Sequence, residues 1–155
     1  MTASPDQFPR QVTVQRIVTV EAPADVAWGV VGQLDSMVPE GGFVERVAVE
    51  GSGEGAIRTY HLVGGGEVIE RIERYDPVDR LYIYRILDVR PLPMTRYLGL
   101  AHVTSAGPGR CHIGWNVMAD SLDGDTTALT AMLEGTVTQA LGAFAAHLAA
   151  GDAGE

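Results

Sequence analysis

Polar and apolar residues alternate over most of the chain between residues 12 and 119. A period of two residues is typical of strands that bury one face. The alternating segments are residues 12–21, 44–50, 56–63, 67–75, 80–88, 95–105 and 110–119. Because short runs rich in glycine, proline or aspartate separate the last six segments, we predict about seven strands, most of them joined as a meander.

A period of three to four residues replaces this alternation near the end of the chain, over residues 126–150. It predicts a helix with one apolar stripe, formed by Leu129, Leu133, Val137, Leu141, Phe144 and Leu148. The acids Asp123 and Asp125 suit the free N–H groups at its start, and we expect Gly151 to end it. Because Glu134 is the only Asp, Glu, Lys or Arg in this range, we expect that the helix does not lie mostly in water.

Between the first two predicted strands, a proline favours the start of a short helix over residues 24–31, and residues 34–37 add a second short turn. The order is thus one strand, two short helices, six strands and one long helix. This segregation indicates an α+β fold rather than a parallel, doubly wound one. We expect a curved antiparallel sheet wrapped around the C-terminal helix, with an internal cavity between them. Residues 1–155 would form a single domain, with flexible ends at 1–10 and 151–155.

Composition narrows the classes of partner and the compartment. Eleven basic and twenty acidic residues give a formal net charge of −9, which argues against nucleic acid and anionic lipid surfaces as partners. Cys111 is the only cysteine, so an internal disulfide is excluded and a reducing compartment is favoured. No apolar run is long enough for a membrane span, and the first ten residues lack a signal-peptide layout. We therefore expect a cytoplasmic protein.

The loop lengths allow the pairing of side chains across the sheet to be predicted. If residues 64–66 form a three-residue loop, Tyr60 falls opposite Glu70, and Arg58 becomes a diagonal neighbour of Glu70 on the same face. A similar argument for the next turn places Tyr84 opposite Glu70 as well. A loop of even length would instead put Glu70 and Arg58 on opposite faces of the sheet.

Glu70 shares its face of the strand with Val68 and Ile72, whereas the other face carries several charges. The pattern therefore places an acid on the apolar side of the sheet. One interpretation is that Glu70 pairs with Arg58 and only holds two strands together. The other is a partly desolvated carboxyl with a raised pKa that moves a proton or binds a polar ligand group, while Arg58 holds a carboxylate or enolate oxygen.

Tyr97 and Trp115 lie on consecutive predicted strands, and an odd-length turn would place both on one face. For Trp115, core packing is the favoured interpretation. The Tyr97 hydroxyl needs a partner, which in a cavity is water or a ligand. The candidate ligand-binding residues are Tyr60, Tyr84, Met94, Trp115, Leu133, Val137, Leu141 and Phe144.

Several short motifs follow one another along the chain. They are Val-Glu-Ala-Pro-Ala-Asp-Val-Ala-Trp at 20–28, Gly-Ala-Ile-Arg at 55–58, Ile-Glu-Arg-Ile at 69–72, Tyr-Arg-Ile-Leu at 84–87, Pro-Leu-Pro at 91–93 with Tyr97, and Trp115. This succession resembles the START-related helix-grip (SRPBCC-like) superfamily, specifically its polyketide cyclase/dehydrase and lipid-transport branch. The resemblance implies a cavity into which Glu70 points, and loops at 64–66 and 91–93 that close its mouth. A tight hairpin is the alternative for residues 64–66.

Other kinds of functional site are not supported by the surrounding sequence. The glycine-rich segment 51–55 precedes a strand rather than a helix, so it is not a dinucleotide fingerprint. There is no P-loop or nucleophile elbow, and the four histidines show no metal-ligand spacing. We therefore expect neither a cofactor nor a metal ion.

Three functions fit these observations. The first is a cofactor-independent cyclase or dehydratase that acts on a hydrophobic, polyketide-like or other natural-product intermediate, with Glu70, Arg58 and Tyr97 as catalytic residues. The alternative is a non-catalytic binding or transport protein for a hydrophobic small molecule. The third is an interaction module in which a bound ligand drives dimerisation. Under this third function the protein would form a homodimer. The buried acid favours the enzyme, because a carrier needs none.

Overall fold

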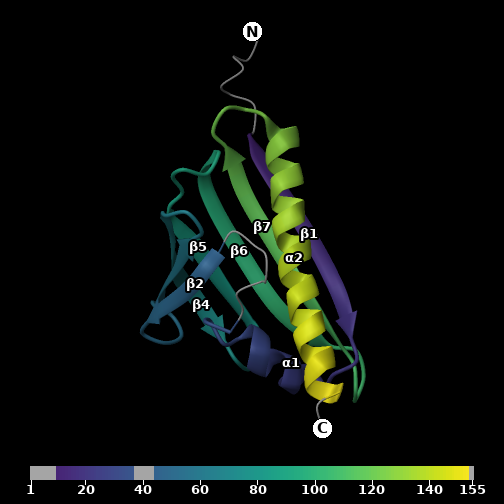
Figure 1. Cartoon of the computed structure of the whole chain (residues 1–155). Helices are drawn as coiled ribbons and strands as arrows, with labels where there is room; N and C mark the ends of the chain where they lie inside the picture. The colour runs from purple at the N-terminus through teal and green to yellow at the C-terminus, as the bar shows by residue number, and fades with distance from the viewer. Residues whose placement is uncertain (1–9, 37–43, 154–155) are drawn as a thin grey trace.

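The computed structural model describes residues 10–36 and 44–153 and shows an α+β fold (Figure 1). Its strands are β1 (Gln11–Val20), β2 (Val44–Glu50), β3 (Ile57–Leu62), β4 (Glu67–Asp76), β5 (Leu81–Asp88), β6 (Met94–Ser105) and β7 (Cys111–Ser121), and its helices are α1 (Ala24–Val31) and α2 (Thr126–Ala153). Every predicted strand is present, and each strand end lies within two residues of its predicted position.

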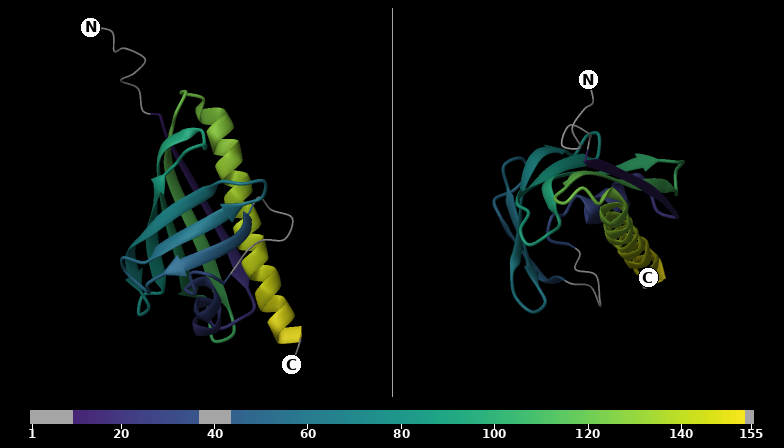
Figure 2. Two further views of the ribbon diagram at one scale, coloured as in Figure 1. Left: turned by 60° about the vertical axis from the view of Figure 1, so that its left-hand side comes forward. Right: turned by 90° about the horizontal axis from the view of Figure 1, so that it is seen from above.

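The strands form one antiparallel sheet in the order β1-β7-β6-β5-β4-β3-β2. Strands β2 to β7 follow chain order as a meander, and β1 joins the far edge beside β7. The sheet curves so that α2 lies on its concave side (Figure 2). This arrangement confirms the predicted helix-grip fold.

Helix α2 buries the predicted apolar stripe against the sheet, since all six of its residues are at most 7% exposed. Asp125 caps the helix, because its Oδ1 accepts the N–H of Ala128 at 3.0 Å. The opposite side of α2 is exposed and carries small residues such as Ala131 and Gly135. Small side chains on that side leave little apolar area to bury, so it can face water although the helix as a whole does not lie mostly in water.

The predicted end of α2 at Gly151 was wrong. Gly151 is helical, and it is absent from the glycines that adopt positive φ, which is the conformation that ends many helices. Glycine weakens a helix interior by about 1 kcal/mol but does not by itself stop it. The predicted flexible end at 151–155 therefore begins inside a helix, and residues 154–155 lie outside the described residues.

Helix α1 closes one end of the sheet. It buries Ala24, Ala27 and Val31, and the ring of Trp28 lies 5.6 Å from that of Tyr75 in β4. Beyond α1, residues 34–36 form turns, in which the Ser36 hydroxyl donates to the carbonyl of Val30 at 2.7 Å. The rest of the second predicted helical turn lies outside the described residues.

The pairing of β3 with β4 differs by two residues from the predicted register. Arg58 lies directly opposite Glu70, and Tyr60 lies opposite Val68 instead of Glu70. The cause is the loop, which closes between Leu62 and Gly66, with the Leu62 N–H donating to the Gly66 carbonyl at 2.9 Å. Because the error is an even number, the face that each residue occupies is as predicted.

The same even shift occurs between β4 and β5. Tyr84 lies opposite Ile72, and Glu70 lies opposite Ile86, so the predicted row of Tyr60, Glu70 and Tyr84 was wrong in register but right in face. A β-bulge between residues 72 and 74 adds a further local offset.

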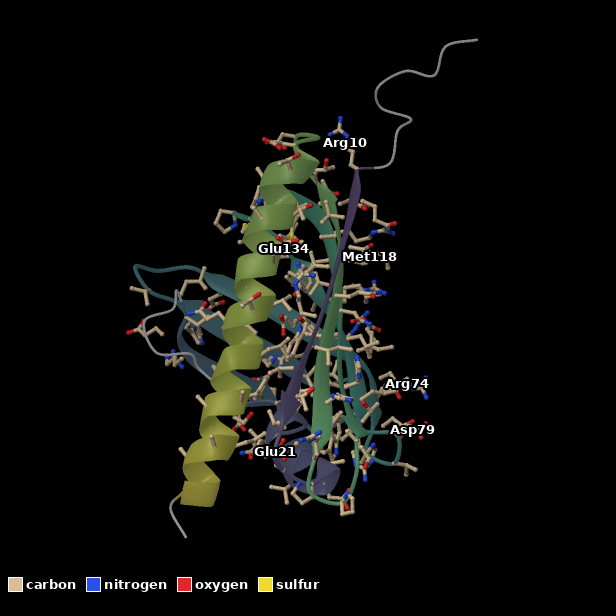
Figure 3. All side chains as sticks on the ribbon, turned by 90° about the vertical axis from the view of Figure 1, so that its right-hand side faces the viewer. Arg10, Glu21, Arg74, Asp79, Met118 and Glu134 are labelled. Carbon is tan, nitrogen blue, oxygen red and sulfur yellow. The ribbon has the colours of Figure 1, made fainter. Side chains whose placement is uncertain are left out.

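The convex side of the sheet faces away from α2. Met118 of β7 and Arg74 of β4 point outward from it (Figure 3). On the helix side, Glu134 forms an ion pair with Arg16 of β1 at 2.9 Å. Neither helix in residues 10–36 and 44–153 is both long and apolar enough to cross a lipid bilayer.

Candidate ligand-binding site

A cavity of about 370 Å³ lies between the concave face of the sheet and α2. This volume falls within the range of about 300–1,000 Å³ that is usual for small-molecule sites. Ten of the predicted site residues line it, namely Arg58, Tyr60, Glu70, Tyr84, Met94, Tyr97, Trp115, Leu133, Val137 and Phe144. The curvature of the sheet thus gathers side chains from β3 to β7 and α2 around one space.

Arg58 and Glu70 form a buried ion pair on the cavity wall, and each residue is at most 5% exposed. Arg58 Nε donates to Glu70 Oε1 at 2.7 Å, and Nη2 lies 2.7 Å from the same oxygen without hydrogen-bond geometry. Arg58 Nη1 donates to the carbonyl of Leu34 at 3.2 Å and to the hydroxyl of Tyr82 at 3.1 Å. Glu70 Oε2 accepts no hydrogen bond from any described residue.

Three tyrosine rings surround the guanidinium group of Arg58. Its central carbon lies 5.2 Å from the ring centre of Tyr60, 5.3 Å from that of Tyr82 and 5.1 Å from that of Tyr84. Cation–π attraction of this kind is strongest where water is excluded. Burial disfavours the charged form of Arg58, but Glu70 and the neighbouring tyrosines more than compensate, so the pKa of Arg58 lies above its usual value. Arg58 is therefore a permanent buried cation.

For Glu70, the partner of Arg58, burial is the largest influence on the pKa. Desolvation raises the pKa of Glu70 above the ordinary 4.5, and the charge and hydrogen bond of Arg58 offset only part of that rise. Glu70 is thus a carboxyl that holds its proton more strongly than a surface glutamate does. A carboxylate with one unpartnered oxygen and a raised pKa can exchange a proton with a bound molecule.

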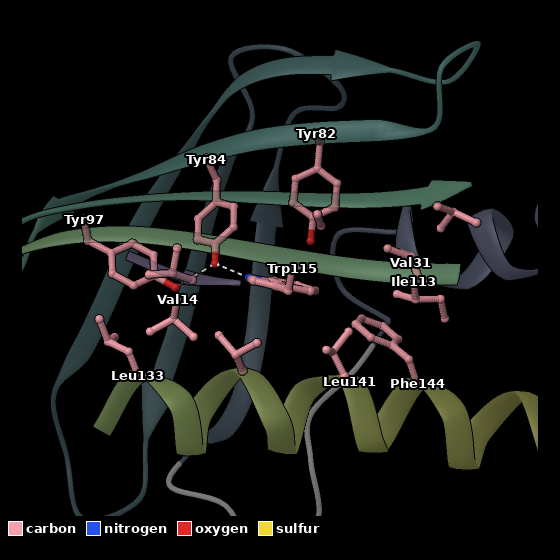
Figure 4. Packing of buried hydrophobic residues seen from close by; sticks show 14 of the residues in the cluster. Val14, Val31, Tyr82, Tyr84, Tyr97, Ile113, Trp115, Leu133, Leu141 and Phe144 are labelled. Carbon is pink, nitrogen blue, oxygen red and sulfur yellow. Dashed lines mark hydrogen bonds between the residues drawn. The ribbon is translucent and has the colours of Figure 1, made fainter. Parts of the chain in front are cut away.

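A second polar cluster joins Tyr84, Tyr97 and Trp115 (Figure 4). The Trp115 indole N–H donates to the Tyr84 hydroxyl oxygen at 2.9 Å, and the hydroxyl oxygens of Tyr84 and Tyr97 lie 2.8 Å apart. Burial is the main cause that raises the pKa of both tyrosines, so both hydroxyls keep their protons at neutral pH. Tyr97 and Trp115 share one face, as the sequence predicted, and the hydroxyl of Tyr84 in β5 contacts both of them.

The remaining wall is aromatic and aliphatic. The rings of Trp115 and Phe144 are stacked, with centres 5.8 Å apart and planes at 20°. The rings of Tyr82 and Trp115 form a T-shaped pair, with centres 6.3 Å apart. The site therefore combines a large apolar surface with two small polar clusters, which is the usual composition of a pocket that orients an organic ligand.

The chain matches the family described as polyketide cyclase / dehydrase and lipid transport over residues 11–149. It belongs to that family. The match covers the whole sheet and nearly all of α2, so the cavity lies within the part of the chain that the family defines. Its members are expected to bind hydrophobic small molecules, and the aromatic wall of this member agrees with that expectation.

Solved structures share the fold. The protein XoxI from Bacillus cereus is 18% identical and has a TM-score of 0.77, with 88% of this chain and 94% of that chain covered. Zhui aromatase/cyclase from Streptomyces sp. R1128 is 21% identical with a TM-score of 0.75, covering 88% and 93%. Norcoclaurine synthase from Thalictrum flavum, in complex with dopamine and hydroxybenzaldehyde, is 21% identical with a TM-score of 0.71, covering 89% and 86%. No curated protein sequence matches this chain.

In this family member the structure corrects one placement. Leu141 was predicted to bind ligand, but it is 4% exposed in the core and does not line the cavity. The apolar stripe of α2 is longer than the cavity, and part of it packs against β1 and β7 instead. Sequence spacing shows which residues share the stripe but not where the sheet touches it.

Sequence reasoning also missed several wall residues. Tyr82 precedes Tyr84 by two positions, so strand alternation could have placed both on the inner face. The other missed residues are Val31, Gln33, Leu34, Ser36, Val44, Val68, Ile86, Leu92, Met132, Thr136, Gln139, Ala140 and Ala143. Those from the α1–β2 connection carry no periodic signal, because only the fold brings that connection to the cavity.

Of the two loops predicted to close the cavity, one lies at the cavity wall and the other does not. Leu92 and Met94 line the cavity, so the segment 91–93 is at its wall. Residues 64–66 do not line it, and all three glycines there adopt positive φ in the hairpin turn. Closure of the mouth by either loop stays a prediction. Within the described part of the chain, no group of three His, Cys, Asp or Glu side chains could hold a metal ion.

Proposed function

We propose that this protein is a cyclase or dehydratase that needs no cofactor and acts on a hydrophobic, polyketide-like or other natural-product intermediate held in the cavity. One observation carries the proposal. Glu70 presents a carboxylate oxygen that accepts no hydrogen bond from the described residues, on the wall of a largely apolar cavity and beside a fixed cation. In a site that only binds apolar ligands, a buried acid would lower the stability of the protein without contributing to its function.

In this proposal the cavity folds the substrate, and Glu70 transfers the proton. Glu70 removes a proton from a carbon next to a carbonyl group, and that carbon then attacks a second carbonyl carbon. The alkoxide that forms takes the proton back from Glu70. Loss of water follows when Glu70 removes another such proton and returns it to the departing hydroxyl group. Arg58 and Tyr97 hold the substrate oxygens, and no oxidant or reductant is needed.

The test uses a small ketone whose proton exchange can be observed directly. 2-Tetralone is neutral and bicyclic, and the protons next to its carbonyl exchange with deuterium in D₂O, which proton NMR measures. We expect the protein to accelerate this exchange and Glu70→Gln to slow it at least about 100-fold, because glutamine has the shape of Glu70 but no basic oxygen. Affinity for 2-tetralone is expected to change little.

The matched control is Glu73→Gln. Glu73 lies on the same strand and contacts Arg71 and Arg85 at the surface, so this variant is expected to exchange protons at the wild-type rate. Exchange that is equally fast in Glu70→Gln and the wild type would contradict the proposal.

The pH dependence of exchange follows from the raised pKa of Glu70. A general base must be deprotonated, so the rate is expected to fall as pH decreases through an apparent pKa above 4.5. The rate should be constant above that pKa until another group titrates. The same limb should be absent from the residual rate of Glu70→Gln. A midpoint at or below 4.5 in the wild type would show that a less buried carboxyl is responsible.

A non-catalytic carrier is the second candidate, and the short contact between Arg58 Nε and Glu70 Oε1 favours it. In that case the pair links β3 to β4 across the sheet, and the cavity binds and releases its ligand unchanged. Binding of 2-tetralone without accelerated exchange would support the carrier. A cytoplasmic location is part of the proposal for either function.

A further inference from the structure

The cluster of Trp115, Tyr84 and Tyr97 has one more donor than it can use. It holds three protons that can be donated: one indole N–H and two phenolic O–H groups. Only two contacts join its members, one between Trp115 and Tyr84 and one between Tyr84 and Tyr97. Whichever tyrosine donates in the second contact, one phenolic proton remains without an acceptor. This count does not depend on how the protons are assigned.

The spare proton has no other protein acceptor in the described part of the chain. Neither phenolic oxygen makes a further hydrogen bond to a described residue, and both tyrosines are at most 7% exposed. Both also line the cavity. A buried donor without an acceptor costs about 1–3 kcal/mol. The acceptor is therefore expected to come from the molecule that fills the cavity.

The cluster can donate a hydrogen bond but does not act as a base. Burial raises the pKa of both Tyr84 and Tyr97, so neither becomes a phenolate near neutral pH. The indole N–H of Trp115 polarises the Tyr84 hydroxyl, and a chain of this kind strengthens its terminal donor. The matching ligand group is thus an acceptor oxygen without a proton of its own, such as a carbonyl oxygen.

The charges on the cavity wall limit the ligand further. Arg58 and Glu70 are the only charged side chains among the described residues that line the cavity, and they neutralise each other. An ionised carboxylate or ammonium group would have to be buried there without a free counter-charge, which is strongly unfavourable. The cavity therefore suits an uncharged molecule.

We propose that Tyr84, Tyr97 and Trp115 form a subsite for the carbonyl oxygen of a neutral, ring-containing ketone. This inference rests on the function proposed above, because it names the class of substrate for the same cavity. It assigns the carbonyl oxygen to the phenolic end of the cavity, whereas Glu70 lies on the β3–β4 side.

The experiment compares two probes that differ in one oxygen atom. 2-Tetralone carries a carbonyl group, and tetralin has the same bicyclic skeleton without it. We expect the wild-type protein to bind 2-tetralone about five- to tenfold more tightly than tetralin, as one hydrogen bond to a buried donor would give. Isothermal titration calorimetry measures both dissociation constants.

The decisive variant is the triple replacement Tyr84→Phe, Tyr97→Phe and Trp115→Phe. It removes all three donors, because loss of the phenolic groups alone would leave the indole N–H of Trp115 without its acceptor and free to bind the carbonyl group. We expect the preference for 2-tetralone over tetralin to fall to within about twofold. Continued binding of tetralin shows that the cavity is still folded, so it separates loss of the subsite from loss of structure.

The single variant Tyr97→Phe gives a further test of the proton count. It leaves two donors and one contact, so the Tyr84 proton becomes free and the preference for 2-tetralone is expected to persist. Loss of the whole preference in this variant would contradict the count.

The infrared band of the carbonyl group is a second measurement that needs no variant. In the wild type, the carbonyl stretch of bound 2-tetralone should lie at a lower wavenumber than in hexane, because a hydrogen bond weakens the C=O bond.

The two affinities also separate the subsite from the proposed function. If tetralin binds and the wild-type protein binds 2-tetralone no more tightly than tetralin, the subsite is overturned and the proposed function stands. If neither probe binds, both are overturned.

Discussion

Replacement of Arg58 by methionine is expected to lower the free energy of unfolding by about 3–5 kcal/mol. The variant removes the cation but leaves Glu70, which is 5% exposed, without a counter-charge inside the protein. Removing one member of a buried ion pair is costly because the other charge remains desolvated. Urea unfolding followed by circular dichroism at neutral pH measures the loss.

The double variant Arg58→Met and Glu70→Met separates this cause from lost packing. Neither charge remains, so most of the lost stability should return, to within about 1 kcal/mol of the wild type. The surface control is Arg74→Met. Arg74 pairs with Asp76, but its side chain is 57% exposed, so the expected change is within about 0.5 kcal/mol. If the double variant is as unstable as Arg58→Met, an unpaired charge is not the reason.

The loss of stability in Arg58→Met should also depend on pH. Without Arg58, burial is the dominant influence on Glu70, and its folded pKa lies above the unfolded value of 4.5. A carboxyl of this kind stabilises the folded state below 4.5, and that contribution is lost as pH rises through the folded pKa. The difference between Arg58→Met and the wild type should therefore be larger at about pH 8 than at about pH 4.

Replacement of Gly99 by alanine is expected to lower the free energy of unfolding by about 2–3 kcal/mol, the upper part of the range for overpacking. Gly99 of β6 lies opposite Tyr84 of β5, and the Tyr84 ring lies across it. A Cβ at Gly99 would overlap the ring and hydroxyl of Tyr84, so the ring must move. Because that hydroxyl holds both contacts of the Tyr84–Tyr97–Trp115 cluster, the preference for 2-tetralone should be lost along with stability.

Gly142→Ala is the matched control, with an effect of opposite sign. Gly142 lies on the exposed side of α2, where an added Cβ would meet no atom within 4 Å. Alanine favours a helix over glycine by about 0.5–1 kcal/mol, so this variant should be more stable than the wild type and keep the ligand preference. Thermal unfolding of both variants measures the difference. Equal effects at Gly99 and Gly142 would contradict the role assigned to the Tyr84 ring.

Much of the site could be predicted because face and stripe are local properties. Strand alternation placed Arg58, Glu70 and Tyr84 on one side of the sheet, and the structure confirms that side although both predicted registers were wrong by two residues. The face of a residue depends only on whether its position is odd or even. The register depends on where a turn closes, and the β3–β4 turn closes at Leu62 and Gly66, which glycine content alone does not reveal.

The sequence by itself therefore determined the strands, the buried stripe of the C-terminal helix and the inward face of Glu70, since each follows from a period of two or of 3.6 residues. Only the tertiary structure decided that Leu141 packs in the core, that Tyr82 joins the tyrosines around Arg58, and that the hydroxyl of Tyr84 meets Tyr97 and Trp115. These contacts join strands that are distant in sequence. Their geometry depends on the curvature of the sheet, on turn closure and on the position of α2, which no local pattern encodes.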